Sequence, residues 1–317
     1  MVNRELNAGT DSYLLYGAES TYGTAATVDK IFGLVKSFTP TLNNTLIKSR
    51  GFAGSTSGGR DVVKVTGGKF EGSFSVELEP LNFDWLQYVL GSRTGSGTIA
   101  SPYAYAGSNT LSSLTVSNCL NNVTTDREMA YLGCVFNSVT IKAAVGEPMT
   151  ATMEFLAADV DKDSTIPSNV AITDVLPYTF AGGSIEIPND AAIPNIIDSV
   201  EFSITNNTKL IHGLGSRVGR RKSEGERDYQ IKVTVKYVDE TLINLFLGNA
   251  SGPTNPTESA TVAVRFDNAD AVRYVDFIFT GATIDTYSET NNLNEMIVEE
   301  HTFIARTLAV NEVQTAA

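Results

Sequence analysis

An acidic run has the spacing of an ion-binding loop. Asp159, Asp161 and Asp163 are placed like the first three acids of a calcium loop. However, Ser164 stands where that loop needs glycine, and Val170 stands where it needs a bidentate glutamate. The run therefore predicts the charge of a linker rather than a calcium site.

Other residues that could do chemistry are also isolated. Gly213-x-Gly215-x-x-x-Gly219 has the glycines of a phosphate-binding loop, but it opens no helix and belongs to no strand–helix–strand unit. His212 and His301 are far apart and lack the cysteine or histidine neighbours of a zinc site. No motif such as G-x-S-x-G places a nucleophile. We therefore expect no catalytic residue, no cofactor and no metal site. We do not expect the protein to be an enzyme.

The cysteines and the N-terminus bear on where the protein is made. Cys119 and Cys134 are expected to be half-buried thiols in neighbouring strands, although a disulfide or a metal pair stays open. No hydrophobic signal segment is visible at the N-terminus. No apolar run approaches the roughly 20 residues that span a bilayer. We expect the protein to be made and folded in a cytoplasm and to have no membrane partner.

The composition favours a globular, strand-rich protein with an acidic surface. Hydrophobic residues make up 42% of the 317 positions, which can supply a substantial core, and the length favours two domains. Valine, threonine and isoleucine are plentiful and favour strands. The net charge of −13 argues against tight nucleic-acid binding, which needs clustered cations. It suits a wall that repels polyanions.

Several patterns occur twice in the same order, which predicts two copies of one domain. Each copy begins with an alternating strand that runs into an Asn-Asn-Thr turn, followed by a loop rich in Gly, Ser and Arg, and then by a second alternating strand. These segments are 37–46, 50–68 and 70–80 in the first copy, and 199–208, 213–228 and 229–239 in the second.

The second part of each copy is a short helix and a hairpin. Apolar residues at helical spacing precede a Leu-Gly stop at 82–91 and at 240–248. Residues 132–157 then align without a gap to 280–305, which matches Gly133 with Gly281, and the hairpin turns are expected at Val145-Gly146 and Asn292-Leu293.

The duplication sets the expected domains and fold class. We expect a first domain at 1–160, an acidic linker at 161–174 and a second domain with a C-terminal tail at 175–317. The fold class is mainly β: two tandem β-sandwich or half-barrel domains, each with one short α-helix.

At these points the sequence resembles the tail tube proteins of long-tailed bacterial and archaeal viruses. The opening segment LLYGAESTYGTAATVDKIFGLVKSFTPTLNN at 14–44 is similar to the usual start of that family, a YG-x-E-x-x-YGT segment before the first strand. The resemblance covers most of the chain. It implies a structural protein of the virion tail, in which sheets of neighbouring subunits join into an inner β-barrel and the rings stack through the long loop.

The resemblance also implies partners. DNA is expected to pass through the tube without specific binding, and a tape-measure protein and tail-tip or terminator proteins are expected to contact it. Because the chain has two copies, three chains are expected to build a ring with pseudo-sixfold symmetry. A ring of six chains with decorating second domains stays open.

Two sets of residues are candidates for these roles. Loop cations are expected to contact a neighbouring subunit in the same ring or the next, although a solvated basic loop and a nucleic-acid contact are alternatives. They are Arg50, Arg60, Arg217, Arg220, Arg221, Lys222 and Arg227.

The polar face of the second strand of each copy supplies the candidate lumen-facing residues. They are Glu71, Glu77, Glu79, Lys232 and Lys236, and simple outward polar positions are the alternative.

The sequence therefore predicts a structural virion protein that polymerises into a hollow tail tube. Related interpretations are the tube of a contractile injection system and a tail terminator or adaptor. An alternative from another class is a secreted or surface β-sandwich that binds carbohydrate, as an adhesin does. It predicts a signal segment and exposed aromatic residues, and the single tryptophan, Trp85, falls in the expected helix instead.

Overall fold

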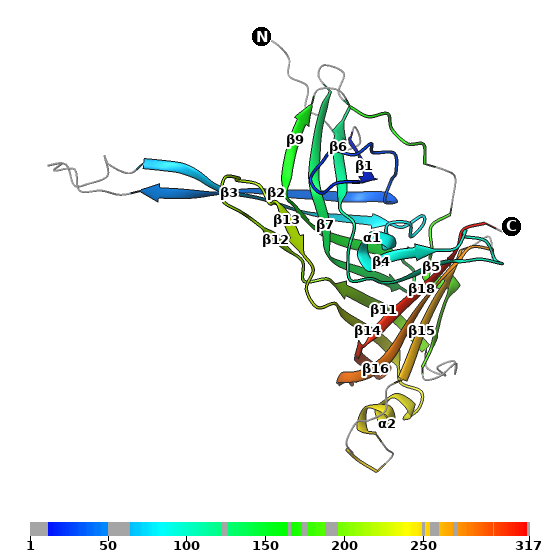
Figure 1. Ribbon diagram of the computed structural model, residues 1–317. Coiled ribbons are helices and arrows are strands. Elements are labelled where there is room, and N and C mark those ends of the chain that lie inside the picture. The colour runs from blue at the N-terminus through cyan, green and yellow to red at the C-terminus, as the bar shows by residue number, and fades with distance from the viewer. Residues whose placement is uncertain are drawn as a thin grey trace, which may run out of the picture.

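The structure is a computed structural model of the chain (Figure 1). It describes residues 12–49, 64–121, 126–163, 166–172, 176–187, 196–248, 251–253, 260–268, 272–293 and 295–315. The described residues form a mainly β protein with two short α-helices, which confirms the predicted fold class.

The first half of the chain supplies nine strands and one helix. They are β1 (Ser12–Ala18), β2 (Leu34–Ser49), β3 (Lys64–Glu79), α1 (Leu86–Leu90), β4 (Gly91–Thr94), β5 (Tyr103–Gly107), β6 (Leu114–Leu120), β7 (Arg127–Ala144), β8 (Thr150–Ala157) and β9 (Asp159–Asp163).

The second half repeats this order, with a 3-10 turn and a pair of short strands added and without an equivalent of the β4–β5 hairpin. Its elements are a 3-10 turn (Phe180–Gly182), β10 (Gly183–Glu186), β11 (Ile196–Thr205), β12 (Lys209–Ile211), β13 (Arg221–Ser223), β14 (Asp228–Lys236), α2 (Thr241–Leu247), β15 (Ala260–Asp267), β16 (Tyr274–Thr290), β17 (Val298–Ala305) and β18 (Thr307–Val313).

One continuous antiparallel sheet runs through both halves. Its order β2-β3-β8-β7-β11-β14-β17-β16 places the strands of the first half beside those of the second, and β7 and β11 make the joint. We call these strands the inner sheet. The long strands β7 and β16 also pair with β6 and β9, and with β15 and β18, so that each half folds into a sandwich. The β4–β5 hairpin of the first half pairs onto β18 of the second.

Aromatic side chains fill the core beneath α1. Trp85 and Phe136 are buried, and Phe136 packs against Phe155 with ring centroids 4.2 Å apart. The helix ends at Gly91, whose φ of 103° lies in the left-handed region, and α2 ends in the same way at Gly248, with φ 81°. Both predicted helices and their glycine stops are therefore confirmed.

Irregularities of the strand register recur at matching positions in the two halves. The β7–β8 pairing shifts between Phe136 and Ser138, and the β16–β17 pairing shifts between Ile284 and Thr286. Gly133 and Gly281, which the sequence aligned, have φ values of 60° and 68°. A bulge is a defined local structure, so shared bulges support a shared ancestry of the halves.

The first predicted Asn-Asn-Thr turn is wrong. β2 continues through Asn43 and Asn44 to Ser49, with a register shift after Asn44, because β3 continues to pair with it. In the second half β11 does end at Thr205, and Asn207 follows with φ 49°. The strand register matches Asn44 with Asn206, because Asn43 and Thr205 occupy equivalent pairs with β3 and β14.

The two Gly/Ser/Arg-rich loops are shorter than the sequence predicted. Residues 64–68 belong to β3, and residues 50–63 lie outside the described residues, together with Arg50 and Arg60. Within the second loop, β13 pairs with β12, which directly precedes the loop. β9 reaches Asp163, within the stretch expected as linker.

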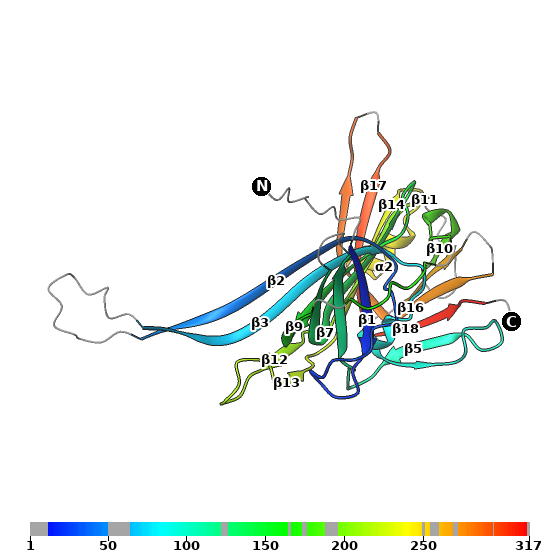
Figure 2. The same cartoon turned by 90° about the horizontal axis from the view of Figure 1, so that it is seen from above.

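The pairing of β2 with β3 also produces an arm. The two strands leave the sandwich together and run far out from the rest of the protein (Figures 1 and 2). Apolar side chains on this arm are exposed, among them Leu46, Ile47 and Val65. Cys119 and Cys134 are free and buried, on the paired strands β6 and β7.

Candidate assembly surface

The inner sheet has one buried face and one bare polar face. The alternation of β3 predicts that Phe70, Phe74, Val76 and Leu78 face the core. Phe74, Val76 and Leu78 are buried, whereas Phe70 is only partly buried. The opposite face is rich in serine and threonine, and we call it the polar face. Its members include Thr39, Thr41, Ser73, Ser75, Ser138, Thr140, Ser203, Thr205, Thr286, Ser288 and Thr302.

The predicted lumen-facing residues of the second half are lysines, and each is paired with an acid. Lys232 Nζ lies 2.8 Å from Glu300 Oε2, and Lys236 Nζ lies 2.9 Å from Asp198 Oδ1. These pairs are partly exposed and contribute little stability. They do remove the net positive charge that the sequence alone suggested for this strand.

The predicted lumen-facing residues of the first half are acids in three different environments. Glu79 is almost buried and pairs with Lys36 at 2.8 Å. Glu71 lies 3.8 Å from His212 Nδ1. Glu77 is exposed on the polar face and accepts a hydrogen bond from Ser37 Oγ at 3.5 Å.

Three of the loop cations bind the first half of the same chain. Arg217 donates to Asn44 Oδ1 at 2.6 Å and to Gly68 O at 3.1 Å. Lys222 donates to Leu111 O and pairs with Glu224. Arg227 donates to Ser108 O at 3.3 Å. The loop therefore fastens the two halves together.

The remaining described loop cations are available to a partner. Within the part of the chain that the structure describes, the side chains of Arg220 and Arg221 have no hydrogen bond and no ion pair, and both are exposed. The sequence grouped all these cations as contacts to a neighbouring subunit, and the structure leaves these two as its best candidates.

A buried asparagine, which the sequence analysis did not single out, locks the joint of β7 and β11. Asn206 Nδ2 donates to Val89 O at 3.1 Å and to Phe136 O at 3.3 Å. Its Oδ1 accepts from Arg227 Nε at 2.7 Å. A buried amide with all these partners fixes the register, since a slip would leave polar groups unsatisfied. The only signal in the sequence was the repeated Asn-Asn-Thr.

A second buried polar group joins the halves on the other side. Glu312 of β18 accepts the Phe83 N–H at 2.9 Å and the Tyr105 hydroxyl at 2.7 Å. Burial raises the pKa of this carboxyl from its ordinary 4.5 to about 7. Because the side chain is fully buried, this raised pKa serves the fold rather than a reaction with solvent-borne substrate.

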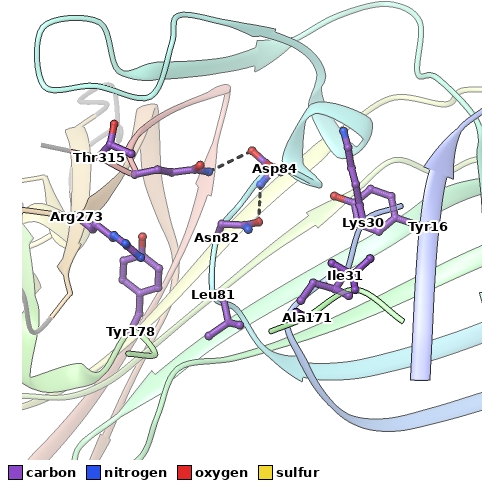
Figure 3. Close-up of a pocket in the computed structure, with 13 residues that line it drawn as sticks. Tyr16, Lys30, Ile31, Leu81, Asn82, Asp84, Ala171, Tyr178, Arg273 and Thr315 are labelled. Atoms are coloured by element: carbon purple, nitrogen blue, oxygen red, sulfur yellow. Dashed lines mark hydrogen bonds between the residues drawn. The ribbon is translucent and has the colours of Figure 1, made fainter. Parts of the chain in front are cut away.

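One hollow of about 440 Å³ lies between the halves (Figure 3). Tyr16, Lys30 and Asp84 line it from the first half, and Tyr178 and Arg273 line it from the second. Asp84 is already bound, by Arg93 at 2.7 Å and by Gln314 at 3.1 Å. The hollow therefore belongs to the joint and offers no uncommitted acid.

The described residues contain no group of three or more His, Cys, Asp and Glu side chains that could hold a metal ion. Among the helices that the structure describes, none is long and apolar enough to cross a membrane.

Comparison with known proteins identifies the family. A family model described as "Phage tail tube protein" matches residues 9–302. The match spans most of the chain, and the protein therefore belongs to the phage tail tube protein family. No curated protein matches the sequence. Membership makes the chain a structural component of the virion tail, which implies a non-enzymatic role, and it gives no support to the carbohydrate-binding alternative.

Proposed function

We propose that the protein polymerises into stacked rings that form the hollow tube of a viral tail, through which DNA passes to the host. The joint between β7 and β11 carries this proposal. It places two equivalent sets of strands edge to edge. Among the strands that the structure describes, it leaves an unpaired edge at each end of the inner sheet. Repeating this joint between chains closes a ring and removes both edges, which a free sheet must otherwise protect.

The number of chains follows from the duplication. Each chain carries two tube domains, at about 1–160 and 175–317, so three chains supply six domains around the bore. In this arrangement the ring has pseudo-sixfold symmetry, with three joints inside chains and three between them.

The polar face lines the bore in this proposal. The other face of the inner sheet is covered by the outer strands, so it is closed to the lumen. Paired lysines together with the unpaired Glu77 give the polar face an acidic balance. Carboxylates repel DNA phosphates, and weak adhesion lets DNA move through the tube.

Stacking uses the two ends of the inner sheet. Arg220 and Arg221 lie near the β12–β13 end, on the side of the protein where the β2–β3 arm also leaves (Figure 1). The opposite end, formed by the β7–β8 and β16–β17 turns and the start of α2, carries Glu147, Glu240 and Glu295. A basic end set on an acidic end extends a filament head to tail. A tape-measure protein and tail-tip proteins are the further proposed partners.

Electron microscopy with light scattering tests the function. Purified protein at rising concentration is expected to give rings or hollow tubes in negative stain, and the smallest ring is expected to have the mass of three 34.0 kDa chains. A ring of six chains would refute the proposed symmetry but not the tube. A monomer at every concentration would count against the tube itself.

A further inference from the structure

The two unpaired edges of the inner sheet identify the contact between protomers. We propose that β16 of one protomer pairs with β2 of the next, in the register that β7 and β11 use inside the chain. This proposal rests on the proposed function, because it names the surface that closes the ring. Its partner is a second copy of this chain.

Strand equivalence supplies the register. The β2–β3 pair Ser37–Glu77 corresponds to the β11–β14 pair Ser199–Thr234. The β7–β8 pair Phe136–Phe155 corresponds in the same way to the β16–β17 pair Ile284–Phe303. β2 is therefore the structural equivalent of β11, and β16 is the structural equivalent of β7.

The free edges are exposed where their equivalents are buried. Phe202 and Ile204 of β11, which pairs with β7, are at most 1% exposed. Leu42, the equivalent of Ile204, is 41% exposed on β2. On the other edge, Glu289 is exposed although its equivalent, Ile141, is buried. β2 and β16 are therefore exposed as expected for strands that lack the neighbouring strand which β11 and β7 have.

The in-chain pairs translate directly into pairs between chains. Glu201–Lys142, Ser203–Thr140 and Thr205–Ser138 lie opposite one another across β11 and β7. The equivalent contacts between β2 and β16 are Thr39–Thr290, Thr41–Ser288 and Asn43–Thr286. Every one of these residues has a short polar side chain, so the new joint continues the polar face without a clash.

On the covered face, the register brings Leu42 to Tyr287. A groove of about 430 Å³ lies there between α2 and β16, lined by Ile243, Leu247 and Tyr287 among others. Inside the chain, the equivalent Ile204 is fully buried. Leu42 of the next protomer is suited to fill this groove, which would bury apolar surface on both sides.

Asn44 repeats the arrangement of Asn206. Each side-chain oxygen accepts a hydrogen bond from an arginine, Arg217 for Asn44 and Arg227 for Asn206. Asn206 uses its amide nitrogen to reach Val89 O and Phe136 O across the joint. Within the described part of the chain, the amide nitrogen of Asn44 has no such acceptor. In the proposed register it faces the carbonyl oxygen of Ile284 on the preceding protomer, the one whose β16 pairs with this β2.

Two residues protect the edges before assembly. Pro40 lacks the N–H of a ladder residue, and Glu289 places a charge on the edge of β16. Both are known devices against indiscriminate strand pairing. The register sets them opposite each other, so the ring loses a single ladder hydrogen bond at this pair.

A disulfide between Thr41→Cys and Ser288→Cys tests the register. Next to the in-chain joint, the Asn206 N–H donates to Asn137 O, so the backbone of Ile204 faces β7 and that of Ser203 faces β14. Ser203–Thr140, and by equivalence Thr41–Ser288, is then a non-hydrogen-bonded pair, whose side chains are closest and within disulfide reach. Oxidised rings of the double variant are expected to run on non-reducing gels as a covalent ladder that ends at three chains.

Matched controls separate the possible results. Thr41→Cys with Thr286→Cys moves one cysteine two residues along β16 and is expected to cross-link at least tenfold less. Ser203→Cys with Thr140→Cys is expected to close within each chain and to leave the gel mobility at one chain. When Thr41→Cys and Ser288→Cys chains are mixed, each chain has only one cysteine at the joint. The expected cross-linked product is therefore two chains and nothing larger.

The outcomes distinguish the register from the function. Rings or tubes in the micrographs without cross-linking of Thr41→Cys/Ser288→Cys would overturn the register and leave the tube intact. Stronger cross-linking of the shifted pair would overturn it as well. Absence of any ring for the wild type would refute the proposed function.

Discussion

The Tyr105 hydroxyl lies 2.7 Å from Oε2 of Glu312, and this hydrogen bond joins β5 of the first half to the last strand of the second. The two residues are far apart in the sequence, and both are buried. Together with the joint of β7 and β11, the bond holds the halves in one rigid relation. A ring built from double subunits depends on that relation.

Glu312 is expected to make stability depend on pH. Its pKa is raised to about 7, so the folded protein holds this proton more tightly than the unfolded chain. The stabilisation is complete below the ordinary pKa of 4.5 and is lost as the pH rises to about 7. The loss amounts to roughly 3 kcal/mol, from the difference between the two pKa values.

Urea denaturation of Glu312→Gln at pH 4.5 and pH 7.5 measures this effect. The free energy of unfolding of the variant is expected to change less between the two pH values than that of the wild type. The exposed Glu147→Gln serves as control and should keep the wild-type difference. Equal pH dependence of Glu312→Gln and the wild type would contradict the assignment.

Asn206→Ala is expected to weaken the joint of β7 and β11. The substitution removes the amide from Val89 O and from Arg227 Nε, whereas Phe136 O keeps its hydrogen bond from the Thr208 hydroxyl. Each buried polar group that is left unsatisfied costs about 1–3 kcal/mol. Chemical denaturation of the monomer measures it. Asn44→Ala is the matched control, because Asn44 is exposed in the single chain, and less than about 1 kcal/mol is expected for it.

Gly133→Ala and Gly281→Ala are both expected to destabilise the fold. Their φ values of 60° and 68° are unfavourable for a residue with Cβ, at about 1 kcal/mol or more. At Gly133 a Cβ would also lie 2.9 Å from Ala158 Cβ, whereas at Gly281 it meets the flexible side chain of Arg306. Thermal unfolding should therefore show the larger loss for Gly133→Ala.

Gly146→Ala isolates the backbone contribution. This glycine has φ 83° and no atom near the position of a Cβ. Its loss of stability is expected to be smaller than that of Gly133→Ala. A result in which all three substitutions cost the same would show that packing against Ala158 contributes nothing.

Charge reversal on the polar face is expected to make the tube bind DNA. Glu71→Lys with Glu77→Lys leaves the buried face untouched, so tubes should still form. Co-sedimentation of assembled tubes with short duplex DNA is expected to rise and to fall again with added salt. Asp161→Lys on β9, in the outer layer, is the control. If it binds DNA as strongly as the double variant, the polar face does not line the bore.

The sequence by itself determined the local structure and the duplication. Alternation predicted strands such as β3 and β14, and helical spacing with a following glycine predicted α1 and α2, because these patterns reflect which face each element buries. The alignment of Gly133 with Gly281 identified two positions that need a left-handed backbone. The family resemblance of the opening segment agrees with the match to tail tube proteins.

Only the tertiary structure decided how these elements meet. The same Asn-Asn pair continues a strand at Asn44 and ends one at Asn206, since the outcome depends on whether the neighbouring strand continues to pair. Arg217 and Lys222 look like free cations in the sequence, yet they are bound to the first half, because only the fold brings their acceptors near. Which edges stay open, and therefore where the next copy binds, follows from the order of strands in the sheet, which no local pattern encodes.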